Sequence, residues 1–251
     1  MPYPILDPKH TDVSLKSLCA LAIMAKAPRP GRVKTRLSPP LTPEEAAAIN
    51  TCFLMDTTEN IGDLADQGAC VGVISYTPVG DEHLFEGILP SGYRLVAQRG
   101  DDFGERLLTT AQDLFVHGFA SVCLIDSDSP TVPREAFSMA VAALQEEGDR
   151  IVLGPSYDGG YYLIGMKQLH PEIFEDITWS TASVFAETVA AVRDVGVELV
   201  TLPMWYDVDD AETLTILHAE LIDAVMPEFT SLRGYPANHT RSLLRRLGVF
   251  A

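Results

Sequence analysis

Two carboxylates, Asp126 and Asp128, directly follow an apolar run, and Pro130 and Pro133 come just after them. The run over residues 121–125 predicts a buried strand that ends at the carboxylates, because the prolines stop it from continuing. Residues two apart on an extended chain point the same way, so the two side chains would repel one another. A divalent cation removes that repulsion, and carboxylate oxygens suit Mg²⁺ or Mn²⁺. A polar turn capped by Asp128 is the alternative interpretation.

A concentrated group of basic residues lies near the N-terminus. Five of them fall within eleven positions, directly after the apolar run 18–25: Lys26, Arg29, Arg32, Lys34 and Arg36. In α/β proteins the loop after the first strand binds phosphates, because its backbone N–H groups form a concave anion site to which basic side chains add charge. The loop contains neither GxxxxGK[ST] nor GxGxxG. A solvated basic loop is the alternative.

A third charged group follows the apolar run 197–202. Asp209 or Asp210 is a natural N-cap for the next helix, but Asp207 has no such structural role. The carboxyl ends of parallel strands fall along one crevice. We therefore expect Asp207 to lie near Asp126 and Asp128.

Further candidates lie between these strands. Asp158-Gly159-Gly160 predicts a hairpin or sharp return, and the glycines leave room for a ligand close to the backbone. Asp158 is also a candidate general base, although a turn role explains it equally well. Trp179 either covers a pocket or belongs to the core. Arg106 either reaches a ligand or pairs with an acid on the surface.

Alternating strands and helices must position these residues. Continuous apolar runs are typical of strands covered on both faces, as in parallel sheets. We expect strands over 18–25, 69–76, 93–98, 121–125, 150–154 and 197–202, and helices over 42–61, 101–117, 133–147, 183–194 and 210–225. Thr42 and Glu45 predict a capping box, Pro133 suits a first helical position, and Ser180 or Thr181 would cap the fourth helix. The polar residues of the first helix, Asn50, Asp56 and Glu59, are expected at the surface.

Composition limits the function. The chain has 251 residues, 47% of them hydrophobic, and a net charge of −17, which disfavours general binding to nucleic acid or to anionic membranes. Four scattered cysteines without CxxC predict free thiols in a reducing compartment. The N-terminus lacks the pattern of a signal peptide, and no apolar run approaches the roughly 20 residues that span a bilayer. We expect a cytoplasmic protein.

The order of these motifs resembles the GT-A-like nucleotide-diphospho-sugar transferases, and within them the bacterial DUF2064 family. The resemblance covers about residues 18–222 and rests on the segments Ala25–Leu37, Gly104–Arg106, Asp126–Pro130, Asp158–Gly165, Trp179–Ser180 and Tyr206–Asp209. It implies a Rossmann-like α/β fold with a mixed, mostly parallel sheet and helices on both faces. We expect an N-terminal arm over 1–17, one transferase domain over 18–225 and a C-terminal tail over 226–251 that packs on it.

The resemblance also implies roles for individual residues. Nucleotide and phosphates would contact Lys26, Gly31, Lys34, Arg36 and Asp126, with Asp126 placed toward the ribose or the metal. Mg²⁺ or Mn²⁺ would contact Asp128, Asp207 and Asp209. Catalysis would involve Asp128 and Asp158, and the substrate pocket would contain Gly159, Gly160, Tyr161 and Trp179. Relatives often have Thr-Pro-Glu-Asp where this chain has Asp210–Thr213, so the helix cap after Asp209 differs.

Three functions fit this site. The first is metal-dependent glycosyl transfer from a nucleotide sugar to a small-molecule acceptor. The second is nucleotidyl transfer from an NTP, as in guanylyl- and cytidylyltransferases, although their Gly-Gly-x-x-x-Arg-x-Gly pattern is missing. The third is a non-catalytic nucleotide-binding module. Both reactions need a diphosphate leaving group to be neutralised, so this set of residues serves either one. A homodimer is a candidate assembly of this chain.

Overall fold

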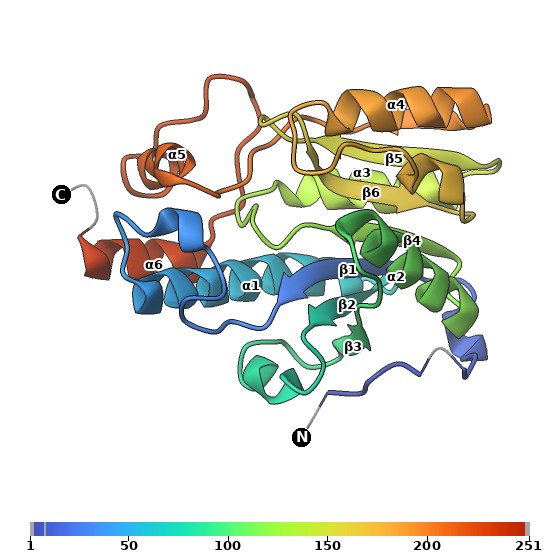
Figure 1. The fold of residues 1–251 in the computed structure, drawn as a ribbon, viewed down its shortest axis with the longest axis horizontal. Coiled ribbons are helices and arrows are strands. Elements are labelled where there is room, and N and C mark those ends of the chain that lie inside the picture. Colours follow the sequence, from blue (N-terminus) through green and yellow to red (C-terminus); the bar gives the residue numbers. More distant parts are fainter. Residues whose placement is uncertain (1–2, 8, 249–251) are drawn as a thin grey trace.

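The computed structural model describes residues 3–7 and 9–248. Its described strands form one sheet in the order β3-β2-β1-β4-β6-β5-β7 (Figure 1). β6 runs antiparallel to β4 and β5, and the other neighbouring pairs are parallel. The predicted mixed, mostly parallel sheet is therefore confirmed. The strands are β1 (Cys19–Lys26), β2 (Cys70–Thr77), β3 (Arg94–Ala97), β4 (Ser121–Ile125), β5 (Arg150–Pro155), β6 (Tyr161–Met166) and β7 (Glu198–Thr201).

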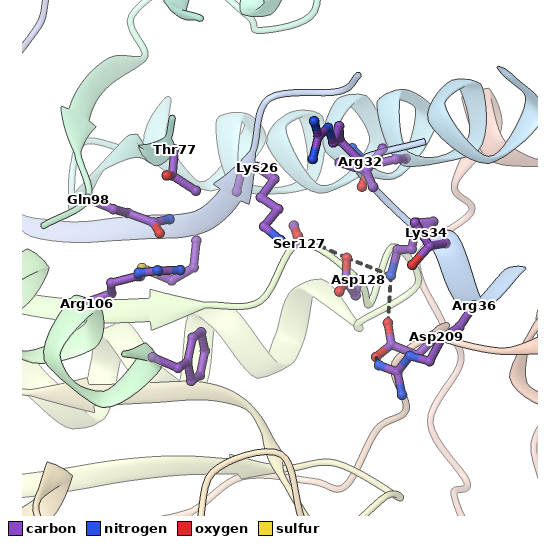
Figure 2. Close-up of a pocket in the computed structure, with 16 residues that line it drawn as sticks. Lys26, Arg32, Lys34, Arg36, Thr77, Gln98, Arg106, Ser127, Asp128 and Asp209 are labelled. Carbon is purple, nitrogen blue, oxygen red and sulfur yellow. Dashed lines mark hydrogen bonds and ion pairs between the residues drawn. The ribbon is translucent and has the colours of Figure 1, made fainter. Parts of the chain in front are cut away.

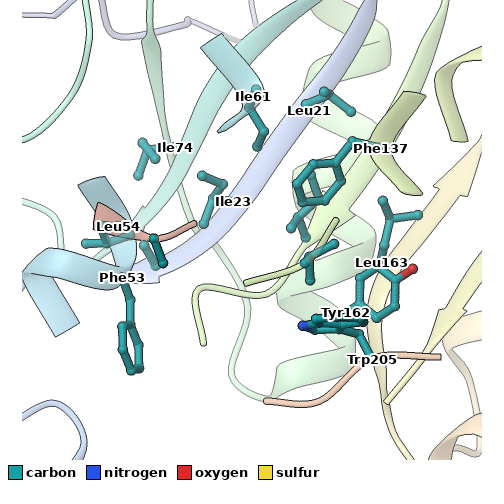
Figure 3. Packing of buried hydrophobic residues seen from close by; sticks show 14 of the residues in the cluster. Leu21, Ile23, Phe53, Leu54, Ile61, Ile74, Phe137, Tyr162, Leu163 and Trp205 are labelled. Atoms are coloured by element: carbon teal, nitrogen blue, oxygen red, sulfur yellow. The ribbon is translucent and has the colours of Figure 1, made fainter. Parts of the chain in front are cut away.

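Helices cover both faces of the sheet. Successive residues of a strand point to opposite faces, so Leu21 and Ile23 of β1 belong to one apolar core and Ala20 and Ala22 to another. The first core is completed by α1 (Pro43–Ala65), α3 (Arg134–Gln145), α5 (Ala211–Ile222) and α6 (Asn238–Leu247), and Figure 3 shows part of it. The second is completed by α2 (Phe103–His117) and α4 (Val184–Val195). The expected Rossmann-like layering is confirmed.

Local capping explains where several helices begin. Thr42 and Glu45 form the predicted capping box of α1, and Asp102 caps α2. Asp210 caps α5 and pairs with Thr213, so the departure from the Thr-Pro-Glu-Asp pattern still gives a reciprocal cap. This leaves Asp209 free of a capping role, since Asp210 accepts the hydrogen bond from the first turn.

Two predicted helix starts were wrong. The N-cap of α4 is Ser183, and neither Ser180 nor Thr181 takes that place. Ser180 lies in the left-handed region at φ 64°, which ends rather than begins regular structure. Pro133 is the N-cap of α3, one position before the place predicted for it.

The C-terminal helix α6 packs on α1, and this overturns the surface prediction for two polar residues of α1. Asp56 is 0% exposed, and its two oxygens accept hydrogen bonds from the backbone N–H groups of His239 and Thr240, at 3.0 and 2.8 Å. Asp56 therefore satisfies N–H groups in the first turn of a helix distant in sequence. Asn50 is also buried, whereas Glu59 is half-buried and contacts His239.

The chain order creates a crevice at the carboxyl end of the sheet. From β1 the chain continues outward through β2 and β3, and it then returns to place β4 on the other side of β1. Ligands of open α/β sheets bind where the strand order reverses in this way. The loop after β1 and the residues after β4 are therefore neighbours in space. Among the described residues, no helix is both long and apolar enough to cross a membrane.

Candidate active site

Two adjoining cavities lie over the strand ends. The first has a volume of about 360 Å³ and the second of about 400 Å³. Four residues line both of them: Arg36, Phe103, Asp128 and Asp209. A ligand bound in one cavity therefore lies next to a ligand bound in the other, as group transfer requires.

The first cavity is basic. Its charged lining includes Lys26, Arg32, Arg36 and Arg106 (Figure 2). Lys26 and Arg36 were predicted for this site. Arg106 also lines the cavity, and its guanidinium donates to the backbone carbonyls of Gly100 and Asp101, so a ligand contact of Arg106 stays a prediction. Such a cluster of cations suits the phosphates of a nucleotide.

Polar residues at the ends of β2 and β3 complete the first cavity, and the sequence prediction missed them. Thr77 ends β2 and Gln98 directly follows β3. The Nε2 of Gln98 donates to the carbonyl of Ser75 at 2.7 Å, which fixes the amide. A polar residue directly after a strand was a usable signal, as it was for Asp126.

The ammonium of Lys34 lies between two carboxylates. Its Nζ is 2.7 Å from Asp128 Oδ1 and 2.9 Å from Asp209 Oδ1, and it donates to the carbonyl of Val208 at 2.8 Å. The Lys34 side chain is only 4% exposed. Burial by itself would lower the pKa of Lys34, but the two carboxylates more than offset this and the pKa is raised.

Asp209 is the most heavily paired carboxylate of the site. One oxygen contacts Lys34, and the other contacts the guanidinium of Arg36. Burial would raise the pKa of Asp209, but these two cations outweigh burial and hold it below its usual range. Asp209 is therefore ionised at neutral pH.

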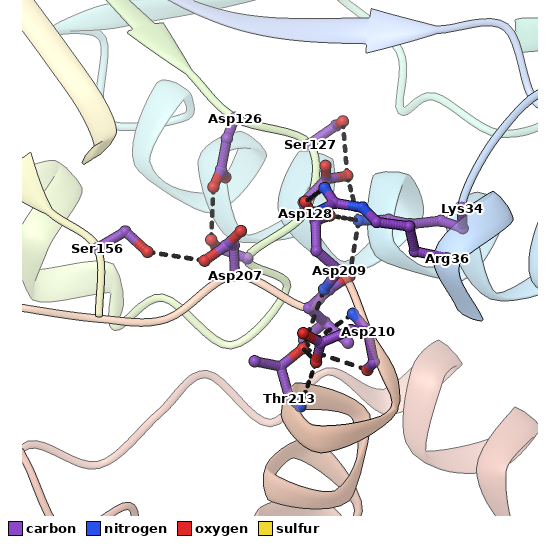
Figure 4. A network of polar contacts seen from close by, with 12 residues as sticks. Lys34, Arg36, Asp126, Ser127, Asp128, Ser156, Asp207, Asp209, Asp210 and Thr213 are labelled. Carbon is purple, nitrogen blue, oxygen red and sulfur yellow. Dashed lines mark hydrogen bonds and ion pairs between the residues drawn. The ribbon is translucent and has the colours of Figure 1, made fainter. Parts of the chain in front are cut away.

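Asp126 and Asp207 lie beside this ion pair (Figure 4), and neither is ion-paired within the part of the chain that the structure describes. Asp126 accepts a hydrogen bond from Ser129 Oγ at 2.6 Å, and Asp207 accepts one from Ser156 Oγ at 2.8 Å. Burial, followed by repulsion from Asp128, raises the pKa of Asp126 well above its usual value. Burial and the charge of Asp158 raise the pKa of Asp207 to about 6. Negative charge on these two carboxylates is thus disfavoured in this site.

The second cavity is acidic and partly aromatic. Asp158, Gly160, Tyr161 and Trp179 all line it. Asp158 Oδ1 accepts a hydrogen bond from the backbone N–H of Gly160 at 2.8 Å, so Asp158 stabilises its turn and also faces the cavity. Trp179 packs edge-on against Tyr161, with ring centroids 6.5 Å apart. The segment therefore forms the predicted turn and also lines a cavity, and its contact with a substrate stays a prediction.

Two glycines of the predicted site have other surroundings. A Cβ on Gly159 would lie 2.2 Å from the carbonyl oxygen of Ala182, so this glycine permits close backbone packing. Gly31 is exposed, has φ +70° and lines neither of the two cavities. Their predicted ligand contacts stay predictions.

The donor set fits a hard divalent cation in its chemistry. Asp126, Asp128, Asp207 and Asp209 supply carboxylate oxygens, and mutual repulsion acts among them. They do not bring three ligand atoms within 4.8 Å of one another, and Lys34 lies between two of them. Among the described residues, that spacing is met by Asp56, Glu59 and His239. Asp56 there already accepts two backbone N–H groups, so the strand-end carboxylates remain the better candidates.

The chain is similar to transferases that use a nucleotide-activated group. A crystal structure of a protein from Desulfovibrio desulfuricans G20, provisionally assigned as a nucleotide-diphospho-sugar transferase, is 30% identical over 92% of this chain and 95% of that chain, with a TM-score of 0.78. The family model described as "Uncharacterized protein conserved in bacteria (DUF2064)" matches residues 60–181. The chain belongs to the DUF2064 family, as the motif resemblance implied.

A more distant relative agrees with this class, and a further solved structure shares the fold. A 2-phospho-L-lactate guanylyltransferase from Methanothermobacter thermautotrophicus is 28% identical over 195 residues, which are 74% of this chain and 80% of that protein. A CMP:2-keto-3-deoxy-manno-octonic acid synthetase solved with CTP has a TM-score of 0.54 at 11% identity, covering 83% of this chain and 100% of that chain, and shows the shared fold alone. The chain is an enzyme of the nucleotidyl- or glycosyltransferase kind, and the hypothesis of a non-catalytic module is set aside.

Proposed function

We propose that this enzyme transfers a glycosyl group from a nucleotide-diphospho-sugar to a small-molecule acceptor, with Mg²⁺ or Mn²⁺ bound at the strand-end carboxylates. The observation that carries the proposal is the contrast between the two adjoining cavities. The first cavity is lined by Lys34 and four other cationic side chains. The second is lined by six carboxylates and by one cationic side chain, Arg36.

The basic cavity suits the donor nucleotide. A nucleoside diphosphate leaves with negative charge, and Lys26, Arg32 and Arg36 line the cavity where that charge would develop. Asp126, Asp128, Asp207 and Asp209 would hold the divalent cation. When bound, such a cation neutralises the departing diphosphate. Lys26, Arg32 and Arg36 would bind the donor in the first cavity and orient its sugar toward the second.

The acidic cavity suits a neutral, hydroxylated group. Its carboxylates can accept hydrogen bonds from sugar or acceptor hydroxyls, and Tyr161 and Trp179 offer ring faces and edges to apolar C–H groups. A phosphate nucleophile would instead be repelled by Asp158, the carboxylate of this cavity that neither caps a helix nor belongs to the proposed metal site. Asp158 faces this cavity with one oxygen held by Gly160, and we assign it to orient the attacking hydroxyl and accept its proton.

Nucleotidyl transfer is the second candidate, because the 28% identical relative is named as a guanylyltransferase. That reaction would place an NTP in the basic cavity and release pyrophosphate. Repulsion from Asp158 in the second cavity disfavours a phosphorylated acceptor there and is our reason for ranking nucleotidyl transfer second.

Product analysis separates the two reactions. The purified enzyme is incubated with Mn²⁺ or Mg²⁺ and either a panel of nucleotide sugars or the free NTPs, together with mixed sugar and alcohol acceptors. Release of a nucleoside diphosphate from one nucleotide sugar, lost in Asp128→Asn, supports glycosyl transfer. Release of pyrophosphate from an NTP, with no reaction of any nucleotide sugar, would overturn the proposal and establish nucleotidyl transfer.

A further inference from the structure

Lys34 has no N–H donor left for a ligand in this conformation. An ammonium group carries three protons, and its three acceptors here are Asp128, Asp209 and the carbonyl of Val208. The ammonium also lies 5.4 Å from the ring centroid of Phe53, which closes one more side. In this conformation Lys34 neutralises protein carboxylates, and its predicted phosphate contact stays a prediction.

The oxygens that Lys34 contacts are oxygens proposed to hold a divalent cation. They are Asp128 Oδ1 and Asp209 Oδ1, and the second oxygen of Asp209 already contacts Arg36. Two cations that contact the same half-buried oxygens repel one another. Binding of a divalent cation at this pair is therefore opposed by the Lys34 ammonium.

The backbone at Lys34 is also held in a costly conformation. Lys34 has φ 49° and ψ 39°, in the left-handed region that non-glycine residues seldom adopt. Such a conformation persists where contacts of the side chain or its surroundings compensate for it, and it often marks a segment with a second state. The ion pairs of Lys34 with Asp128 and Asp209 supply that compensation here.

We propose, resting on the proposed function, that Lys34 is a built-in counter-cation that is exchanged on ligand binding. Without ligand, its ammonium holds Asp128 and Asp209 and prevents their mutual repulsion. When a divalent cation and a nucleoside diphosphate bind together, the ammonium leaves these oxygens and pairs with the phosphates in the first cavity, which Lys34 also lines. No charge then loses its partner.

This exchange couples the two ligands. A divalent cation that binds alone leaves the Lys34 ammonium without its carboxylates, so its affinity is low. A nucleoside diphosphate supplies new acceptors, and each ligand must strengthen the binding of the other by the same factor. The enzyme would thus bind the metal–nucleotide complex in preference to either component.

The test measures binding only, so a failure of transfer activity does not affect it. Mn²⁺ affinity is measured by electron paramagnetic resonance with and without GDP or UDP, for the wild-type enzyme and for Lys34→Met. In the wild type we expect the nucleotide to tighten Mn²⁺ binding to the enzyme by at least about fivefold. The Mn²⁺ bound by nucleotide in solution is subtracted in this comparison. In Lys34→Met we expect Mn²⁺ alone to bind at least about fivefold more tightly than in the wild type, and the nucleotide to add little.

Lys26→Met is the matched control. Lys26 lines the same cavity and is exposed, and the structure assigns it no ion pair with Asp128 or Asp209 among the described residues. The Lys26→Met substitution removes one positive charge, as Lys34→Met does. It should leave the Mn²⁺ affinity measured without nucleotide within about twofold of wild type.

A folded Lys34→Met protein that binds Mn²⁺ no more tightly than wild type would overturn the exchange, since Lys34 would then only support the carboxylates. If Lys34→Met does not fold, the wild-type measurement decides: absence of coupling between Mn²⁺ and both nucleotides overturns the proposal.

Discussion

The indole of Trp179 lies directly against Gly104, in the first turn of α2. A Cβ on Gly104 would come within 2.5 Å of Trp179 Nε1 and within 2.9 Å of Cε2. Trp179 also packs edge-on against Phe103, with centroids 5.3 Å apart. Phe103 lines both cavities and Trp179 lines the second, so this contact holds one wall of the second cavity, where we propose that the acceptor binds.

Gly104→Ala should therefore displace Trp179 and weaken acceptor binding. We expect the acceptor KM to rise by about tenfold, while the affinity for the donor nucleotide stays near that of wild type. Alanine is normally the better helix residue by about 1 kcal/mol, so any loss of stability would report the clash. Steady-state kinetics and a shift in Trp179 fluorescence test this.

Gly62→Ala provides the control for that substitution. Gly62 lies within α1, and a Cβ there would meet no atom within 4 Å. It should stabilise the protein by about 0.5–1 kcal/mol and leave both KM values unchanged. An unchanged acceptor KM in Gly104→Ala would mean that Trp179 does not contact the acceptor.

Ligand-free stability should fall as pH rises from 5 to 8. The pKa of Asp207 is about 6 in the folded protein, and that of Asp126 is raised well above its usual value, against an ordinary aspartate value of about 3.9. The folded state therefore holds more protons than the unfolded state in this range, and stability decreases as pH increases. For Asp207 the loss of stability begins above the unfolded-state pKa and levels off once the pH exceeds the folded-state pKa of about 6.

Asp207→Asn should remove part of this pH dependence. The amide can still accept the hydrogen bond from Ser156 Oγ, but it carries no charge. We expect it to gain about 1 kcal/mol over wild type at pH 8, or about 2–4 °C in Tm, and little at pH 5. Calorimetry at several pH values measures this, and a larger gain at pH 5 than at pH 8 would contradict it.

Asp56→Ala should destabilise the protein without changing its chemistry. The substitution leaves the backbone N–H groups of His239 and Thr240 without their buried acceptor, at a cost of about 2 kcal/mol. Neither α6 nor Asp56 lines the two cavities, so kcat at 25 °C should match wild type. Chemical denaturation gives the stability. Asp56→Asn, which retains one acceptor, should lose less, and an equal loss would point to packing instead.

The strand-end logic explains how much of the site was predictable from sequence. Asp126 and Asp128 directly follow β4, at the strand-end crevice where ligands of α/β sheets bind. Asp207 comes after β7 in a segment that returns along the sheet, held by the bridge between Ser156 and Trp205. The same logic applies to Thr77 and Gln98, but their neutral side chains do not by themselves indicate a phosphate or metal site. Signals that depend on a residue and its own strand were therefore sufficient for much of the cavity lining.

Signals that depend on distant partners were not available. Lys34 looks like a phosphate ligand because it lies in a basic loop, and its pairing with Asp209, 175 positions away, has no local pattern. Asp56 looks like a surface residue of an amphipathic helix, because only the packing of α6 on α1 buries it. The fold followed from the alternation of apolar runs, whereas the charge pairing within the site required the tertiary structure.

Arg36→Met should weaken donor binding with little effect on folding. Arg36 is 72% exposed, lines both cavities and pairs with Asp209. Exposed ion pairs contribute about 0–1 kcal/mol to stability, so the variant should fold normally. Loss of one cation beside the diphosphate should raise the donor KM by about tenfold at low salt, and less at high salt.

Arg29→Met is the matched control, because Arg29 is 53% exposed and pairs with Asp81 but lines neither cavity. Equal increases in KM for both variants would show a general effect of net charge and would remove Arg36 from the donor site.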